Sequence, residues 1–154
     1  MKRIIVSKEK PPKWILDAVK KKFGVEWIDG MIFTYVRNDD TKASKNPEYH
    51  ISTPGGTISE DLFEHEKVHI KQQGKNPDTW WKKYLEDEEF RSEQELEAYQ
   101  KQFEFVKLLF INRKISSGKL LDLLQHYARL LSGSMYGSVI SYDKALQLIK
   151  NEDE

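Results

Sequence analysis

The chain has 154 residues, a length that suits one domain with a hydrophobic core, and we predict a single domain over residues 1–154. Its 25 Lys and Arg residues balance 25 Asp and Glu residues, so no net charge draws the protein to nucleic acid or to an anionic membrane. The absence of cysteine excludes disulfides, thiolate metal sites and cysteine nucleophiles, which leaves histidine and carboxylate side chains as metal ligands.

The apolar and basic runs of the sequence are short. The apolar run at residues 4–6 is far below the length of a signal-peptide core. The longest candidate for a membrane span, residues 105–111, is interrupted by Lys107, whereas a span needs roughly 18 to 20 apolar residues. The basic segments 20–22 and 113–119 are typical of solvated helix surface. We therefore expect a cytoplasmic protein with no membrane and no nucleic-acid partner.

The first third of the chain predicts three strands and one helix. A strand over residues 2–6 precedes a helix whose apolar residues share one face and which ends at Gly24. Residues 31–36 and 49–53 predict two further strands, and the turn residues of 38–47 predict a long loop between them. These two strands fit an antiparallel hairpin.

The remainder of the chain predicts helices. Thr57 and Glu60 have the spacing of a capping box, so a helix is expected to begin near Ile58 and to end at Gly74. Further helices are expected over residues 77–90, 92–112 and 119–131 and after Ser141. The pattern predicts an α+β fold: a small antiparallel or mixed sheet, with an edge strand beside the helix that begins near Ile58, and a helical C-terminal half.

Two histidines, His65 and His69, lie four residues apart in that helix, with Glu66 beside them. At this spacing the imidazoles project from one face, one turn apart, close enough to share a metal ion. In a zinc site, neutral imidazoles hold the cation, the pKa of a bound water falls toward about 7, and a neighbouring carboxylate takes the proton. This is the HExxH pattern, which provides that division of labour.

Two histidines leave a zinc site short of a third protein ligand. The predicted helix over 92–112 carries three glutamates near its start, Glu93, Glu95 and Glu97. Because a step of two residues turns a helix by about 200°, one of the three at most faces the metal comfortably. The spacing leaves the choice among them open.

The chain around residues 57–100 resembles the gluzincin metallopeptidases, in which HExxH is followed by a helix with the motif Glu-x-x-Ala-(Asp or Tyr), here residues 95–99. The resemblance implies that Zn²⁺ is the cofactor, with His65, His69 and Glu95 as its ligands. It also implies peptide-bond hydrolysis with Glu66 as the general base. Tyr99 stands where many members have an aspartate that orients a ligand histidine, so the Tyr99 hydroxyl or another residue must do this.

The resemblance also implies a substrate and a rival function. In that family an edge strand before the HExxH helix pairs with an extended peptide, which places a peptide or protein substrate along residues 48–53. Short zincin-like proteins of phages and bacteria resemble the chain as well, including a glutamine after the second histidine, here Gln72. The alternative function is a non-catalytic zincin-fold structural or interaction module, with an assembly partner in a larger particle. A fourth protein ligand such as His50 would close the site and favour that alternative.

Other aromatic and histidine residues could belong either to the site or to the hydrophobic core. Tyr136, in a loop after a predicted helix, is a candidate donor of a hydrogen bond to the transition state, with packing over the core as the alternative. His126 is a weaker candidate for that role, and its helical spacing from neighbouring leucines favours packing. We expect the helical bundle to be packed by Trp80, Trp81, Tyr84, Phe103, Val106, Phe110 and the leucines of 120–131.

Overall fold

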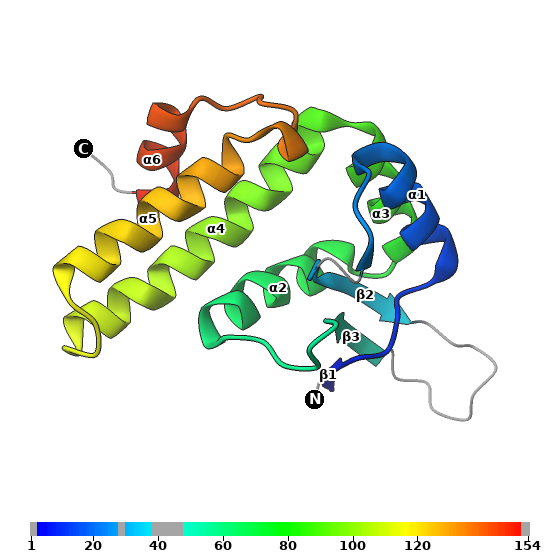
Figure 1. Ribbon diagram of the computed structural model, residues 1–154, viewed down its shortest axis with the longest axis horizontal. Coiled ribbons are helices and arrows are strands. Elements are labelled where there is room, and N and C mark those ends of the chain that lie inside the picture. Colours follow the sequence, from blue (N-terminus) through cyan, green and yellow to red (C-terminus); the bar gives the residue numbers. More distant parts are fainter. Residues whose placement is uncertain (1–2, 28–29, 38–47, 152–154) are drawn as a thin grey trace. The chain divides into compact units, whose positions relative to one another are not determined.

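The computed structural model describes residues 3–27, 30–37 and 48–151. Over these residues the chain has the predicted α+β fold, with a small mixed sheet followed by helices (Figure 1). Contacts within the chain divide it into two compact units, which we call the sheet unit (Met1–Ser59 and His69–Leu85) and the helical unit (Glu60–Val68 and Glu86–Glu154). Folding of the chain as one domain stays a prediction.

The sheet contains β1 (Ile4–Ser7), β2 (Phe33–Arg37) and β3 (Glu48–Ser52) in the order β1-β3-β2. The predicted antiparallel pairing of β2 with β3 is confirmed, whereas the loop predicted over 38–47 lies outside the described residues. The prediction that the strand before the HExxH helix is an edge strand is wrong. Strand β1 pairs in parallel with the other side of β3, so both sides of β3 carry hydrogen bonds.

Helix α1 (Lys13–Phe23) follows β1 and buries Ile15 and Val19. It ends at Gly24, as the sequence predicts, because this residue adopts the left-handed conformation (φ 67°) that glycine tolerates without a steric cost. The Gly24 N–H donates to the Lys20 carbonyl and completes the cap.

Helix α3 (Pro77–Glu86) contributes the aromatic residues Trp80 and Trp81 to the sheet unit. The Trp81 ring stacks on Phe33 of β2, with 6.1 Å between ring centroids. Within the described contacts, Trp81 therefore packs with the sheet and Trp80 stacks on Tyr84 of the same helix, whereas the sequence predicted that both tryptophans pack the helical bundle.

The helical unit contains α4 (Glu88–Ile111), α5 (Ser117–Leu131) and α6 (Tyr142–Lys150). Figure 1 shows α4 and α5 lying side by side, with α6 against them. Their core consists of Tyr99, Phe103, Val106, Leu124, Tyr127, Ala128, Leu131, Ala145 and Ile149. Phe110, predicted to be core, is 40% exposed because it lies in the last turn of α4, beyond Val106.

Two helix boundaries differ from those predicted. Helix α2 (Glu60–Gln73) begins after Ser59, which has the extended backbone of an N-cap, so the predicted start near Ile58 is two residues early. The boundary between α3 and α4 lies at Asp87, before the predicted one at residues 90–92, and the Asp87 carboxylate accepts the N–H of Phe90.

Among the described residues, none of the helices combines the length and the apolar character that a membrane span requires.

Candidate metal centre

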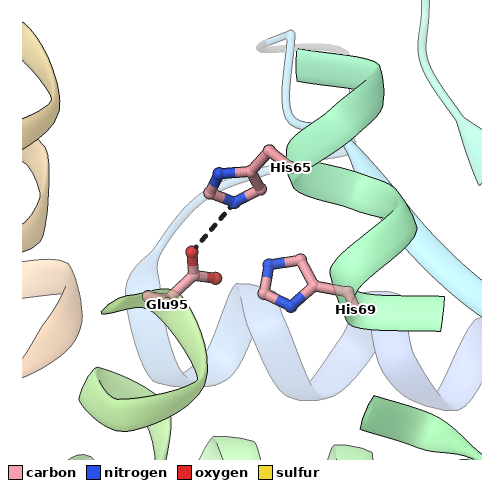
Figure 2. A group of neighbouring side chains, drawn as sticks. All are labelled: His65, His69 and Glu95. Atoms are coloured by element: carbon pink, nitrogen blue, oxygen red, sulfur yellow. Dashed lines mark hydrogen bonds and ion pairs between the residues drawn. The ribbon is translucent and has the colours of Figure 1, made fainter. Parts of the chain in front are cut away.

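Helix α2 presents His65 and His69 on one face, and α4 supplies Glu95. Figure 2 shows the two imidazoles and the carboxylate turned toward one another. One ligand atom from each residue lies within 4.8 Å of the others, and all three side chains are buried. The structure thus brings together the three residues that the sequence singles out, as a group that could hold a metal ion. Their role as ligands stays a prediction.

The structure separates Glu95 from the two glutamates that flank it. Glu95 is 4% exposed, and its Oε2 lies 3.1 Å from His65 Nε2. Glu93 and Glu97 are exposed, as expected from the rotation of about 200° between residues two apart on a helix. Of the three candidates, Glu95 is the one in the group.

Each histidine makes a hydrogen bond between its Nδ1 and a glutamine side chain. His65 Nδ1 lies 2.9 Å from Gln102 Oε1, and His69 Nδ1 lies 2.8 Å from Gln72 Oε1. Because an amide oxygen accepts and does not donate, each Nδ1 must carry a hydrogen. This leaves Nε2 of both imidazoles as the atom that offers a lone pair to a cation.

A chain of hydrogen bonds continues from Gln102 away from His65. The Gln102 Nε2 donates to Asp61 Oδ2 over 2.8 Å, and the Tyr127 hydroxyl donates to the same oxygen over 2.7 Å. Burial raises the pKa of Tyr127, and its hydrogen bond to Asp61 acts in the same direction, so the hydroxyl keeps its proton.

Sequence reasoning missed Gln102, Asp61 and Tyr127. A helical-spacing signal was available for the first two: Gln102 lies seven residues after Glu95, and Asp61 lies four residues before His65. These spacings place each residue on the same helix face as a candidate ligand. Tyr127 comes from a separate helix and has no such local signal.

Tyr99, which stands where the resembled family often has an aspartate, contacts His65 through its ring. The ring centroids are 4.6 Å apart and the planes meet edge-on at 71°. Burial and the nearby Glu95 carboxylate raise the pKa of Tyr99, and a hydrogen bond from Tyr136 opposes this rise. The Nδ1 of His65 bonds to Gln102, so a residue other than Tyr99 supplies the orienting oxygen.

Tyr136 lies in the 3-10 helix η2 (Ser134–Tyr136), and its ring contacts that of Tyr99 edge-on. Its hydroxyl hydrogen-bonds to Tyr99, which in turn contacts His65. The buried Arg91 of α4 donates to the Met135 carbonyl over 3.1 Å and holds this segment. A catalytic role for Tyr136 stays a prediction.

The structure also locates the other residues weighed as parts of the site. Glu66, the predicted base, is 7% exposed and lies next to His65 on α2. His50 lies in β3, its Nε2 is 3.0 Å from Glu48 Oε2, and it does not belong to the group of candidate ligands found among the described residues. His126 is exposed, and its ring centroid lies 6.2 Å from that of its neighbour Tyr127.

The last residue of α2, Gln73, bonds to the outer side of strand β2. Its Nε2 donates to the Thr34 carbonyl over 2.6 Å, and its Oε1 accepts the Val36 N–H over 3.1 Å. Since β3 is hydrogen-bonded on both sides, the predicted pairing of a peptide with residues 48–53 is wrong. On the side of β2 away from β3, the amide of Gln73 is hydrogen-bonded to two backbone groups.

Compared with protein-family models, curated proteins and solved structures, the chain matches none of them. Any function assigned to the chain must therefore follow from the residues of the site.

Proposed function

We propose that the chain binds zinc through the buried group of His65, His69 and Glu95 and hydrolyses peptide bonds. The observation that carries this proposal is the group itself, in which two imidazoles and a carboxylate converge within 4.8 Å. Two nitrogens and one carboxylate oxygen are a ligand set that zinc prefers in catalytic sites. Such sites have three protein ligands and keep a further coordination position open for water or substrate.

The distances in the group suit a zinc ion. Zinc bonds of about 2.1 Å at tetrahedral angles place ligand atoms about 3.4 Å apart. His65 Nε2 and Glu95 Oε2 are 3.1 Å apart, and all three ligand atoms lie within 4.8 Å of one another. The separation that tetrahedral zinc requires lies between these two values. The Nδ1 hydrogen bonds to Gln102 and Gln72 present Nε2 as the ligand atom on both histidines.

The hydrolytic step needs a proton acceptor beside the metal. When bound, zinc lowers the pKa of a water toward about 7 and polarises a carbonyl. Glu66 follows His65 directly on α2 and is buried, so its carboxylate is the proposed acceptor of the proton from water and its donor to the leaving amine. Tyr136, held beside Tyr99, is the proposed donor to the developing oxyanion.

Zinc binding and hydrolysis are tested by two measurements on the same preparations. Metal content by mass spectrometry is expected to give one zinc per chain in the wild type and in Glu66→Gln, because Glu66 is not a ligand. Cleavage of a library of quenched fluorescent peptides is expected to fall by about 10²- to 10⁴-fold in Glu66→Gln, since the general base is lost.

The matched control is Glu64→Gln, which removes a carboxylate two residues away on α2 that pairs with Lys67. It is expected to keep both zinc and cleavage. Equal activity of Glu66→Gln and Glu64→Gln would overturn the role of Glu66. Zinc without cleavage in the wild type would support the non-catalytic module instead, and a wild type that takes up no zinc would overturn the metal centre.

A further inference from the structure

We propose that Gln102 is a positioning residue that sets the orientation and the protonated nitrogen of His65, and that Asp61 and Tyr127 hold Gln102 in place. The inference rests on the proposed binding of metal by His65 but does not depend on peptide hydrolysis. It goes beyond the ligand set because it assigns a role to residues that do not touch the metal.

The amide of Gln102 has one orientation that satisfies both of its neighbours. Its Oε1 accepts from His65 Nδ1 over 2.9 Å, and its Nε2 donates to Asp61 Oδ2 over 2.8 Å. A flipped amide would direct its NH₂ group at the imidazole N–H and its oxygen at a carboxylate, so a donor would face a donor and an acceptor an acceptor. Asp61 thus fixes which end of Gln102 faces His65.

Tyr127 completes the support from a third helix. Its hydroxyl donates to the same Asp61 oxygen over 2.7 Å, so this one atom accepts from both α4 and α5. The pKa of Tyr127 is raised, mainly by burial, and the donor therefore persists at ordinary pH. Gln102 and Tyr127 are 1% and 2% exposed, which prevents water from taking over their hydrogen bonds without rearrangement.

The helix spacings align these contacts along one seam. Asp61 and His65 are four residues apart on α2, while Glu95 and Gln102 are seven residues apart on α4. Both pairs share a helix face, so α4 contacts His65 at both ring nitrogens: Glu95 at Nε2 and Gln102 at Nδ1. Gln102 thus holds the imidazole at Nδ1, while Nε2 faces the Glu95 carboxylate at the position proposed for the cation.

The first test is the zinc affinity of Gln102→Met, measured by competition with a chromophoric chelator. Methionine has nearly the shape of glutamine, but its thioether sulfur is only a weak acceptor for the Nδ1 hydrogen and cannot donate to Asp61. We expect the affinity to fall by about 10- to 100-fold, the usual cost of removing an orienting partner of a ligand histidine. The matched control is Gln100→Met on the same helix, because the Gln100 amide donates to the Leu148 carbonyl and not to a candidate ligand. It is expected to keep wild-type affinity.

A pair of Asp61 variants tests the same inference without altering Gln102. Asp61→Asn keeps a carbonyl oxygen that accepts from both Gln102 and Tyr127, whereas Asp61→Leu removes it. We expect Asp61→Asn to stay within about threefold of wild-type affinity and Asp61→Leu to lose about tenfold or more. This pair decides the matter should Gln102→Met fail to fold.

Long-range ¹H–¹⁵N correlation spectra of the zinc-loaded protein report on the Nδ1 hydrogen of His65 itself, and Gln100→Met controls for any general effect of the substitution on exchange. The Nδ1 hydrogen of His65 is expected to exchange slowly in the wild type and in Gln100→Met, and rapidly in Gln102→Met and Asp61→Leu. Wild-type affinity and slow exchange in both of these last variants would overturn the positioning role while leaving the metal centre intact. Failure of the wild type to bind zinc would overturn the metal centre and the positioning role with it.

Discussion

The two candidate ligand histidines share one helix but are held in different ways. His65 is bonded to Gln102 of α4, which continues to Asp61 and to Tyr127 of α5. His69 is bonded to Gln72 of its own helix, three residues away. One imidazole is therefore oriented through residues distant in sequence and the other through a local contact. The two histidines of one short motif can thus be oriented by partners at very different distances along the chain.

The largest loss of zinc affinity is expected on removing Glu95, because its Oε2 faces His65 Nε2 at 3.1 Å. We expect Glu95→Ala to lower zinc affinity by more than about a hundredfold, since a ligand is lost outright and not merely misoriented. The exposed Glu97→Ala is the control and should bind zinc like the wild type. Titration with a competing chelator measures both. Equal affinities would show that Glu95 is not a ligand.

Gln73→Met should weaken the sheet unit by removing the two hydrogen bonds that this buried amide makes to β2. The Thr34 carbonyl and the Val36 N–H would be left without that partner, so we expect the free energy of unfolding to fall by about 2 kcal/mol. Urea denaturation measures the change. The neighbouring Gln72→Met, whose side chain is partly exposed, is the control and should lose less. An equal loss in both would contradict a structural role for Gln73.

The stability of the protein at alkaline pH should depend on Tyr127, whose hydroxyl donates to Asp61 behind His65. The pKa of Tyr127 is raised by burial and by Asp61, so its stabilisation is complete below the unfolded-state pKa of about 10 and is lost as the pH rises toward the folded-state value. The free energy of unfolding of the wild type should therefore fall more steeply above about pH 10 than that of Tyr127→Phe, by at most about 1.4 kcal/mol per pH unit. Urea titrations at several pH values measure both slopes, and parallel slopes would contradict the assignment.

The smallest effect is expected at Gln72. Its side chain is partly exposed and bonds to His69 from the same helix, so water can replace its oxygen in Gln72→Ala. We expect zinc affinity to fall by no more than about fivefold, well below the loss in Gln102→Met. The chelator competition used for the other variants compares the two directly. A larger loss in Gln72→Ala than in Gln102→Met would reverse the proposed contrast between the histidines.

The features that the sequence predicts well are those set by short spacings. Gly24 ends α1 because its own backbone conformation requires glycine. His65 and His69 meet on one face because four residues make about one turn of helix. The same periodicity allows only one of Glu93, Glu95 and Glu97 to face the histidines, and the resemblance to gluzincins is what selects Glu95.

The features that the sequence does not predict depend on contacts between distant segments. The central position of β3 arises because β1, more than forty residues earlier, pairs with its second side. The support of His65 joins α2, α4 and α5, so spacing along any single helix shows only part of it. Trp81 packs on Phe33 of β2, a choice of partner that aromatic composition cannot reveal.

The hydrogen bonds of Gln73 to β2 also fix how the C-terminal end of α2 is rotated about the helix axis. Gln73 lies four residues after His69, on the same face of the helix, and its amide fits the Thr34 carbonyl and the Val36 N–H in one setting. Inserting a single residue between them would rotate His69 by about 100° relative to the strand. The number of residues between His69 and Gln73 thus sets the orientation of His69. Substitutions at the positions between them should be tolerated far better than an insertion or a deletion.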